Sequence, residues 1–246
     1  MSKTARSTAV VAVVLVASGV VLGGEAWLAV RHPHPLDPPP APDDLLAGPP
    51  PTAGGAVATV VWLGDSTAAG VGASTVADIL PEQVASLLGQ PVRLTVLARS
   101  GARVADVLRL QLPHLAALHP SEVFISVGAN DATHLTWRSR FRRDYGRLLA
   151  GLPASVVQVV VLAVPDLGGA ARLAQPLRAV AGWRGRELAS DIRNLARRRH
   201  AIYVDIAAGT GPAFRHDPER YFAADHYHPS DAGYHLWATI VVAALR

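Results

Sequence analysis

Five short runs of mostly apolar, β-branched residues recur along residues 57–246, and helical stretches lie between them. A run that is apolar at nearly every position is typical of a strand that is covered on both faces of a sheet. Strands that alternate with helices favour a parallel sheet between two helical layers. The sequence therefore predicts an α/β fold, a three-layer α/β/α sandwich around a five-stranded parallel sheet. The predicted strands are 57–63, 92–97, 123–127, 156–164 and 202–206, and the predicted helices are 76–89, 103–118, 138–151, 184–199 and 230–244.

Two segments precede this predicted domain. Lys3 and Arg6 stand before residues 7–24, eighteen residues without a charge. As a helix this run would be roughly 27 Å long, close to the ~30 Å hydrocarbon core of a bilayer. This pattern predicts that residues 1–31 form a membrane anchor and that the rest of the chain lies outside the cytoplasm. A signal peptide cleaved after Ala26, which would release a secreted protein, is the alternative.

Residues 32–56 hold nine of the nineteen prolines in the chain, which predicts an extended, Pro-rich linker between the anchor and the domain at 57–246. The chain has no cysteine, which excludes disulfides and a thiolate nucleophile. Its 23 basic residues outnumber 19 acidic ones, but they are scattered, so we expect no nucleic-acid partner. The Arg-rich stretches 138–147 and 193–199 predict solvated helix faces, with contact to anionic lipid as the alternative.

The first predicted strand is followed by Gly64-Asp65-Ser66. A serine at a tight turn between a strand and a helix is exposed at the sheet edge, the setting of a nucleophilic hydroxyl. The alternative is that Asp65 or Ser66 only caps a helix. A phosphate-binding loop is disfavoured, because no Lys follows Gly70 or Gly72 and the glycine spacing does not fit a dinucleotide fingerprint.

Asp225 stands three residues before His228, just ahead of the last predicted helix. A carboxylate at this spacing can accept a hydrogen bond from Nδ1 and leave Nε2 free to take a proton from a serine. A metal site that combines His226 and His228 with Asp225 and Asp231 is the alternative.

Gly101 and Asn130 follow the second and third predicted strands. Gly101 could bring a backbone N–H close to a ligand, and the Asn130 side chain supplies an N–H donor for a developing oxyanion. The alternatives are an ordinary turn glycine and an Asx turn.

In this order and at successive strand ends, the blocks resemble those of the SGNH hydrolases, also called GDSL-type esterases and lipases. The four blocks of that family match Ser66, Gly101, Asn130 and His228, the last with Asp225. The resemblance covers about residues 60–240 and implies a flavodoxin-like sandwich. It implies catalytic residues Ser66, Asp225 and His228, and an oxyanion hole of the Ser66 and Gly101 backbone N–H groups with the Asn130 side chain. It implies no metal and no other cofactor.

Two positions depart from the family pattern. Thr67 follows the serine where the family nickname has Leu, and His226 gives Asp225 a second neighbouring imidazole. The family spacing and the turn at Pro229 favour His228 as the partner of Ser66.

The resemblance implies a serine esterase or lipase that hydrolyses small-molecule or lipid carboxylic esters through an acyl-serine intermediate. The same residues would also serve an acyltransferase or a carbohydrate O-acetylesterase, and a non-catalytic module that binds wall or lipid components is a further alternative. We expect residues 165–183 to wall the acyl pocket and the chain to be a monomer that contacts a membrane through its N-terminal segment.

Overall fold

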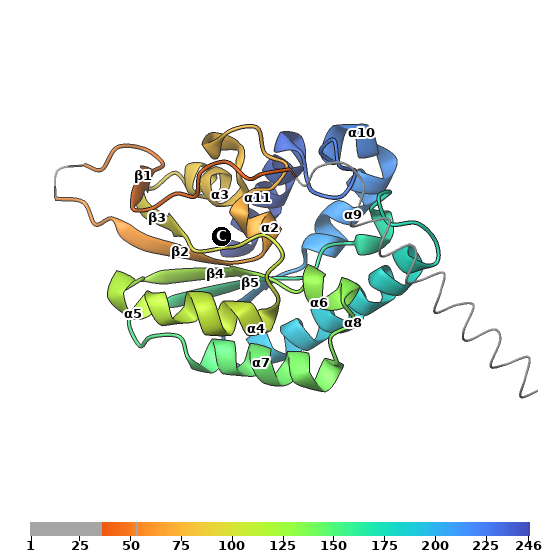
Figure 1. Ribbon diagram of the computed structural model, residues 1–246. Helices are drawn as coiled ribbons and strands as arrows, with labels where there is room; N and C mark the ends of the chain where they lie inside the picture. The colour runs from red at the N-terminus through yellow and green to blue at the C-terminus, as the bar shows by residue number, and fades with distance from the viewer. Residues whose placement is uncertain (1–35, 53) are drawn as a thin grey trace, which may run out of the picture.

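The computed structural model describes residues 36–52 and 54–246 as a six-stranded sheet between two layers of helices (Figure 1). The strand order is β1-β3-β2-β4-β5-β6, and all neighbouring pairs are parallel except β1 with β3. The predicted α/β sandwich and its five parallel strands are therefore present. The strands are β1 (Leu45–Ala47), β2 (Ala58–Gly64), β3 (Val92–Val96), β4 (Glu122–Ser126), β5 (Gln158–Leu162) and β6 (Ile202–Val204).

Strand β1 corrects the expected strand count and part of the expected linker. It lies within residues 32–56, where the prolines predicted an extended spacer, yet it pairs antiparallel with β3 in the register Leu45↔Leu94. The carbonyl of Pro42 also accepts a hydrogen bond from the backbone N–H of Val96 (2.8 Å). An edge strand needs hydrogen bonds on one side only, so a segment flanked by prolines can join the sheet there. Residues 42–47 thus belong to the domain.

The predicted anchor at residues 1–31 lies outside the described residues. Within residues 36–52 and 54–246, no helix combines the length and the apolar character that a membrane span requires.

The helices agree with prediction at 138–151 and 230–244 and differ elsewhere. The predicted helix 103–118 is broken into short pieces, because Pro113 has no N–H to continue it. Helix α8 begins seven residues earlier than predicted, and α9 was not predicted, because Gly209, Gly211 and Pro212 mask its helical pattern. The helices are α2 (Ser66–Ala69), α3 (Leu80–Leu88), α4 (Val104–Asp106), α5 (Leu115–Leu118), α6 (Ala129–Thr133), α7 (Arg138–Ala150), α8 (Leu177–Arg198), α9 (Ile206–His216), α10 (Pro218–Tyr221) and α11 (Asp231–Leu245), with shorter turns η1 (Val76–Asp78), η2 (Val107–Gln111), η3 (Leu112–His114) and η4 (Leu167–Gly169).

Helices α3 and α11 cover one face of the sheet, and α4, α7 and α8 cover the other (Figure 1). The core between them includes Trp62 on β2 and Phe124 on β4, which are fully buried register partners with stacked rings 4.6 Å apart. Helices α2, α6 and α9 start directly after β2, β4 and β6. Because these strands are parallel, their following residues meet at one edge of the sheet, where ligands bind in such folds.

Candidate active site

Ser66 lies at the sharp turn from β2 into α2. Gly64 ends the strand in a conformation with φ +156°, and a Cβ there would stand 2.1 Å from the carbonyl oxygen of Ser126, so only glycine fits. The Asp65 carboxylate then caps α2 by accepting from the Thr67 backbone N–H (3.0 Å) and hydroxyl (2.9 Å). This turn places Ser66 as the first residue of the helix, at the edge of the sheet.

The side chain of Gln111 is hydrogen-bonded to the backbone of the same turn, a role that the sequence analysis did not predict. Its buried side-chain amide accepts a hydrogen bond from the Gly64 N–H and donates one to the Gly64 carbonyl, both at 2.8 Å. Gln111 ends a π-helical turn, η2, which sequence periodicity does not reveal. The amide locks the backbone directly before Asp65.

The structure brings Ser66, His228 and Asp225 into one hydrogen-bonded chain. His228 Nε2 is 2.9 Å from Ser66 Oγ, and His228 Nδ1 is 2.6 Å from Asp225 Oδ2. The other carboxylate oxygen, Asp225 Oδ1, accepts the backbone N–H groups of Tyr227 (3.0 Å) and His228 (2.9 Å). The carboxylate therefore fixes both the loop and the imidazole ring.

Close approach of the histidine loop depends on Gly72, which follows α2. Its φ is +96°, and a Cβ there would stand 2.5 Å from the Pro229 carbonyl oxygen and 3.2 Å from the His228 Cβ. An alanine would push this loop away from Ser66. The neighbouring His226 is exposed, and its carbonyl accepts the backbone N–H of Arg172 (3.2 Å), so His226 does not compete with His228 for Ser66.

Two carboxylates near the site have opposite pKa shifts. Burial acts to raise the pKa of Asp225, but the hydrogen bonds and charge of His228, with the backbone N–H groups, outweigh it and hold that pKa below its usual range. Asp225 Oδ2 also lies 3.4 Å from an Arg172 guanidinium nitrogen. Burial raises the pKa of Asp65 to about 6, against the lowering effect of its hydrogen bonds from Thr67 and of the His228 charge.

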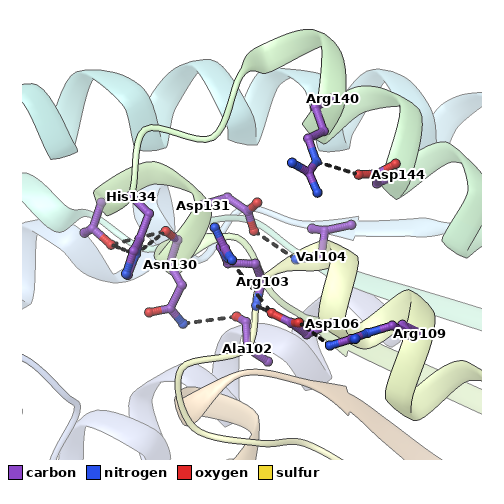
Figure 2. Close-up of polar contacts among 11 residues, drawn as sticks. Ala102, Arg103, Val104, Asp106, Arg109, Asn130, Asp131, His134, Arg140 and Asp144 are labelled. Atoms are coloured by element: carbon purple, nitrogen blue, oxygen red, sulfur yellow. Dashed lines mark hydrogen bonds and ion pairs between the residues drawn. The ribbon is translucent and has the colours of Figure 1, made fainter.

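Asn130, at the start of α6, lies next to the loop that contains Gly101. Asn130 Nδ2 donates to the Ala102 carbonyl (3.1 Å), which joins the start of α6 to the residue after Gly101 (Figure 2). An amide nitrogen carries two hydrogens, so the second remains for a ligand in the pocket that Asn130 lines. Gly101 has φ +78°, a left-handed conformation that favours glycine.

Asp131, the residue after Asn130, has a positioning contact that the sequence analysis did not predict. Its buried carboxylate accepts the backbone N–H of Val104 (3.0 Å), which fixes α4 against α6 (Figure 2). Burial raises its pKa, while the Val104 N–H lowers it. In the part of the chain that the structure describes, no group of three or more His, Asp or Glu residues is arranged to hold a metal ion.

A mostly apolar pocket with a cavity volume of about 40 Å³ opens beside Ser66 and His228. The predicted wall was 165–183, and its first part, residues 165–170, does line the pocket. Farther along, Arg172 contacts Asp225, and residues from 177 on belong to α8. The opposite wall was not predicted, because it comes from α9, the segment after it and α11. Its apolar side chains are Phe214, Phe222 and Trp237.

Residues 62–236, which contain Ser66, Gly101, Asn130, Asp225 and His228, match the model of the GDSL-like Lipase/Acylhydrolase family. The chain belongs to this family. It is 32% identical over 188 residues to the GDSL-like esterase Rv1075c of Mycobacterium tuberculosis. The aligned region covers 74% of this chain and 60% of that protein. The chain thus spans less than two thirds of the length of this curated relative.

Solved structures with 19–20% identity share the fold of this GDSL-family chain. A lipase/acylhydrolase from Enterococcus faecalis is 20% identical, with a TM-score of 0.59 over 76% of this chain and 94% of that one. Axe2, an acetylxylan esterase from Geobacillus stearothermophilus, is 19% identical, with a TM-score of 0.57 over the same shares.

Proposed function

We propose that this GDSL-family chain is a serine esterase that cleaves carboxylic esters through a covalent acyl-Ser66 intermediate. The observation that carries the proposal is the hydrogen-bonded chain from Ser66 Oγ through His228 to Asp225, with distances of 2.9 and 2.6 Å. A hydroxyl is a poor nucleophile until an adjacent base takes its proton, and Nε2 lies at the right distance to do so.

In the proposed first step, Ser66 Oγ attacks the ester carbonyl while His228 Nε2 accepts the hydroxyl proton. Asp225 keeps the other proton on Nδ1 and stabilises the positively charged ring. The carbonyl oxygen becomes an oxyanion, for which the Ser66 and Gly101 backbone N–H groups and Asn130 Nδ2 are the proposed donors. His228 then gives its proton to the alcohol, which leaves.

In the second step, a water molecule attacks the acyl-serine carbonyl and His228 Nε2 accepts its proton. The second tetrahedral intermediate collapses, the proton returns to Ser66 Oγ and the carboxylic acid leaves. The chain's own side chains supply every proton transfer in this sequence.

The pocket supports a short acyl group as the substrate's acid part. Its cavity volume of about 40 Å³ and its apolar wall of Phe214, Phe222 and Trp237 suit an acetyl or butyryl group better than a long lipid chain. We therefore expect kcat/KM to be higher for the acetyl and butyryl esters of p-nitrophenol than for the palmitoyl ester.

The test is the Ser66→Ala variant of the full chain, assayed with p-nitrophenyl butyrate and with a fluorophosphonate probe. We expect loss of both hydrolysis and covalent labelling, with an unchanged melting temperature. Full hydrolysis by Ser66→Ala would disprove the nucleophile assignment. Labelling of Ser66 in the parent without any release of free acid would instead favour transfer of the acyl group to an acceptor other than water.

We also propose that the domain lies outside the cytoplasm, tethered through residues 1–31. The support is the charge-free run at 7–24 after Lys3 and Arg6. Protease added to intact spheroplasts should degrade the domain, and protection from the protease would argue against this location.

A further inference from the structure

Helices α7 and α8 lie side by side on one face of the sheet (Figure 1). Together they carry 11 of the chain's 23 basic residues. Helix α7 has five Arg and one acidic residue, and α8 has six Arg and two acidic residues, so each carries a charge of +4. The whole chain carries only +4, so the rest of the sequence is net negative, at −4. The positive charge is therefore concentrated on one helical layer.

The arginines of α7 reach solvent even where they form ion pairs. Arg138 pairs with Asp191 on α8 (2.7 Å), and Arg140 pairs with Asp144 (3.6 Å), yet the two side chains keep 45% and 61% of their surface exposed. Figure 2 shows Arg140 and Asp144 together on α7. Because the three acidic side chains are shared among more arginines than they can neutralise, the layer keeps an excess of exposed positive charge.

Exposed apolar side chains stand where this layer meets the edge of the sheet that holds the candidate active site. Leu135, Trp137 and Trp183, named here the aromatic rim, are 52%, 81% and 53% exposed. Leu135 and Trp137 lie between α6 and α7, only a few residues after Asn130, and Trp183 lies on α8. Large apolar side chains that cluster at the surface are typical of a site of interaction.

The buried guanidinium of Arg184 joins the two parts of the rim. It donates to the Thr136 carbonyl (2.6 Å), and its central carbon lies 5.7 Å from the centre of the Trp183 ring. The Thr136 N–H in turn donates to the Asp131 carbonyl (2.9 Å). The loop is thus held in a defined shape that keeps Trp137 in solvent, although Leu135 must adopt an unfavourable φ of +51°.

We propose that the aromatic rim and the basic α7–α8 layer form a docking surface for an anionic phospholipid bilayer. Indole rings prefer the level of the lipid headgroups, where an apolar body and a polar N–H are both accommodated. Arginines beside them attract the negative surface of the bilayer. A soluble polyanion would use the arginines but would not explain the two exposed tryptophans and the exposed leucine of the aromatic rim.

Docking in this orientation turns the edge of the sheet with Ser66 toward the bilayer, because the rim follows α6 directly. The inference rests on the surface alone, so it stands or fails separately from hydrolysis by Ser66. The binding site on the bilayer would be its anionic headgroups, with no need for one particular lipid.

The absence of cysteine makes a single-label experiment possible. Ser139→Cys places one label site next to the rim on α7, and Ser155→Cys places one in the loop before β5, at the opposite edge of the sheet. Both serines are exposed, and both changes are nearly isosteric. Each full-length variant is labelled with the polarity-sensitive dye NBD and reconstituted in vesicles of phosphatidylcholine, without or with a minority of phosphatidylglycerol.

We expect the Ser139→Cys label to shift to shorter wavelength only in the vesicles that contain phosphatidylglycerol, and the Ser155→Cys label to stay unchanged in both. Raising sodium chloride from about 0.1 M to about 1 M should reverse the shift, because the Debye length falls from ~10 to ~3 Å. Adding Arg140→Gln to the labelled variant should lower the ratio of docked to undocked protein about fivefold, the equivalent of ~1 kcal/mol for one basic residue.

Any of four results would overturn the proposal. One is an unchanged Ser139→Cys emission in the anionic vesicles, and another is an equal shift for Ser155→Cys. The third is retention of the full shift when Trp137→Ala and Trp183→Ala are added, with circular dichroism showing a native fold. If soluble heparin shifts the Ser139→Cys label as the vesicles do, the surface binds polyanions and the bilayer proposal is wrong.

Discussion

Replacing Asp225 by asparagine keeps the shape of the side chain and should remove most of the activity. Asp225 Oδ1 accepts two backbone N–H groups, at 3.0 and 2.9 Å, and these donors require an oxygen in that position. The new amide nitrogen must therefore replace Oδ2, which faces His228 Nδ1 at 2.6 Å. An NH₂ group there can only donate, so Nδ1 must accept and the ring proton moves to Nε2. Nε2 then has no lone pair for the Ser66 proton.

The opposite amide orientation would restore the base but is disfavoured. It would break two hydrogen bonds at roughly 0.5–1.5 kcal/mol each, so it costs about 1–3 kcal/mol. The orientation that restores the base is therefore about 5- to 150-fold less populated than the orientation that blocks it. In that minor orientation the neutral amide also no longer stabilises the positively charged ring. The two effects together should lower kcat/KM by about 10³–10⁴, the scale of the loss when a triad aspartate becomes asparagine.

The assay is kcat/KM for p-nitrophenyl butyrate, with thermal unfolding of each variant as the test of folding. Asp205→Asn is the matched control, because Asp205 also accepts a backbone N–H group (Ala208, 3.1 Å) and also pairs with an arginine, Arg193, but does not contact His228. The control should keep the parent rate. A folded Asp225→Asn variant with kcat/KM within about tenfold of the parent would refute the assignment of Asp225 as the group that orients the ring.

Three further predictions concern the neighbours of this hydrogen-bonded chain. Asp65→Asn should remove a pH dependence of stability. Because the folded pKa of about 6 lies above the usual 3.8, the free energy of unfolding of the parent falls by about 3 kcal/mol as pH rises from below 4 to above 6. The gain in melting temperature from the variant should therefore grow over that range, and a constant difference would contradict the burial argument. Gly72→Ala should lower kcat by displacing the loop at Pro229. Gly89→Ala is the control and should leave kcat unchanged, because Gly89 also has a positive φ but a Cβ there would meet no atom within 4 Å. Equal rates for the two variants in a steady-state assay would exclude the steric explanation. Asn130→Ala should lower kcat by about 10²–10³ with little change in KM, and a parental kcat would remove Asn130 from the oxyanion hole.

Much of the fold was predictable because a strand buried on both faces must be apolar at nearly every position, and this pattern is visible in the sequence. β1 shows no such apolar pattern, because an edge strand of three residues between prolines has too few positions to form one. The helix 103–118 was mispredicted for a related reason: its apolar periodicity is helical, but Pro113 and the inward turn to Gln111 depend on a contact with Gly64, far away in the chain.

The residue types of the site, Ser66, Asn130, Asp225 and His228, and their places after successive strands were determined by the sequence, because each block is local. Only the tertiary structure decided that His228 and not His226 reaches a serine 162 positions earlier, since that depends on Gly72 allowing two loops to approach. It also decided that the pocket has a volume of only about 40 Å³ and that Trp137 and Trp183 stay exposed beside a basic layer. Contacts between distant segments set these properties, and no local pattern of residues carries them.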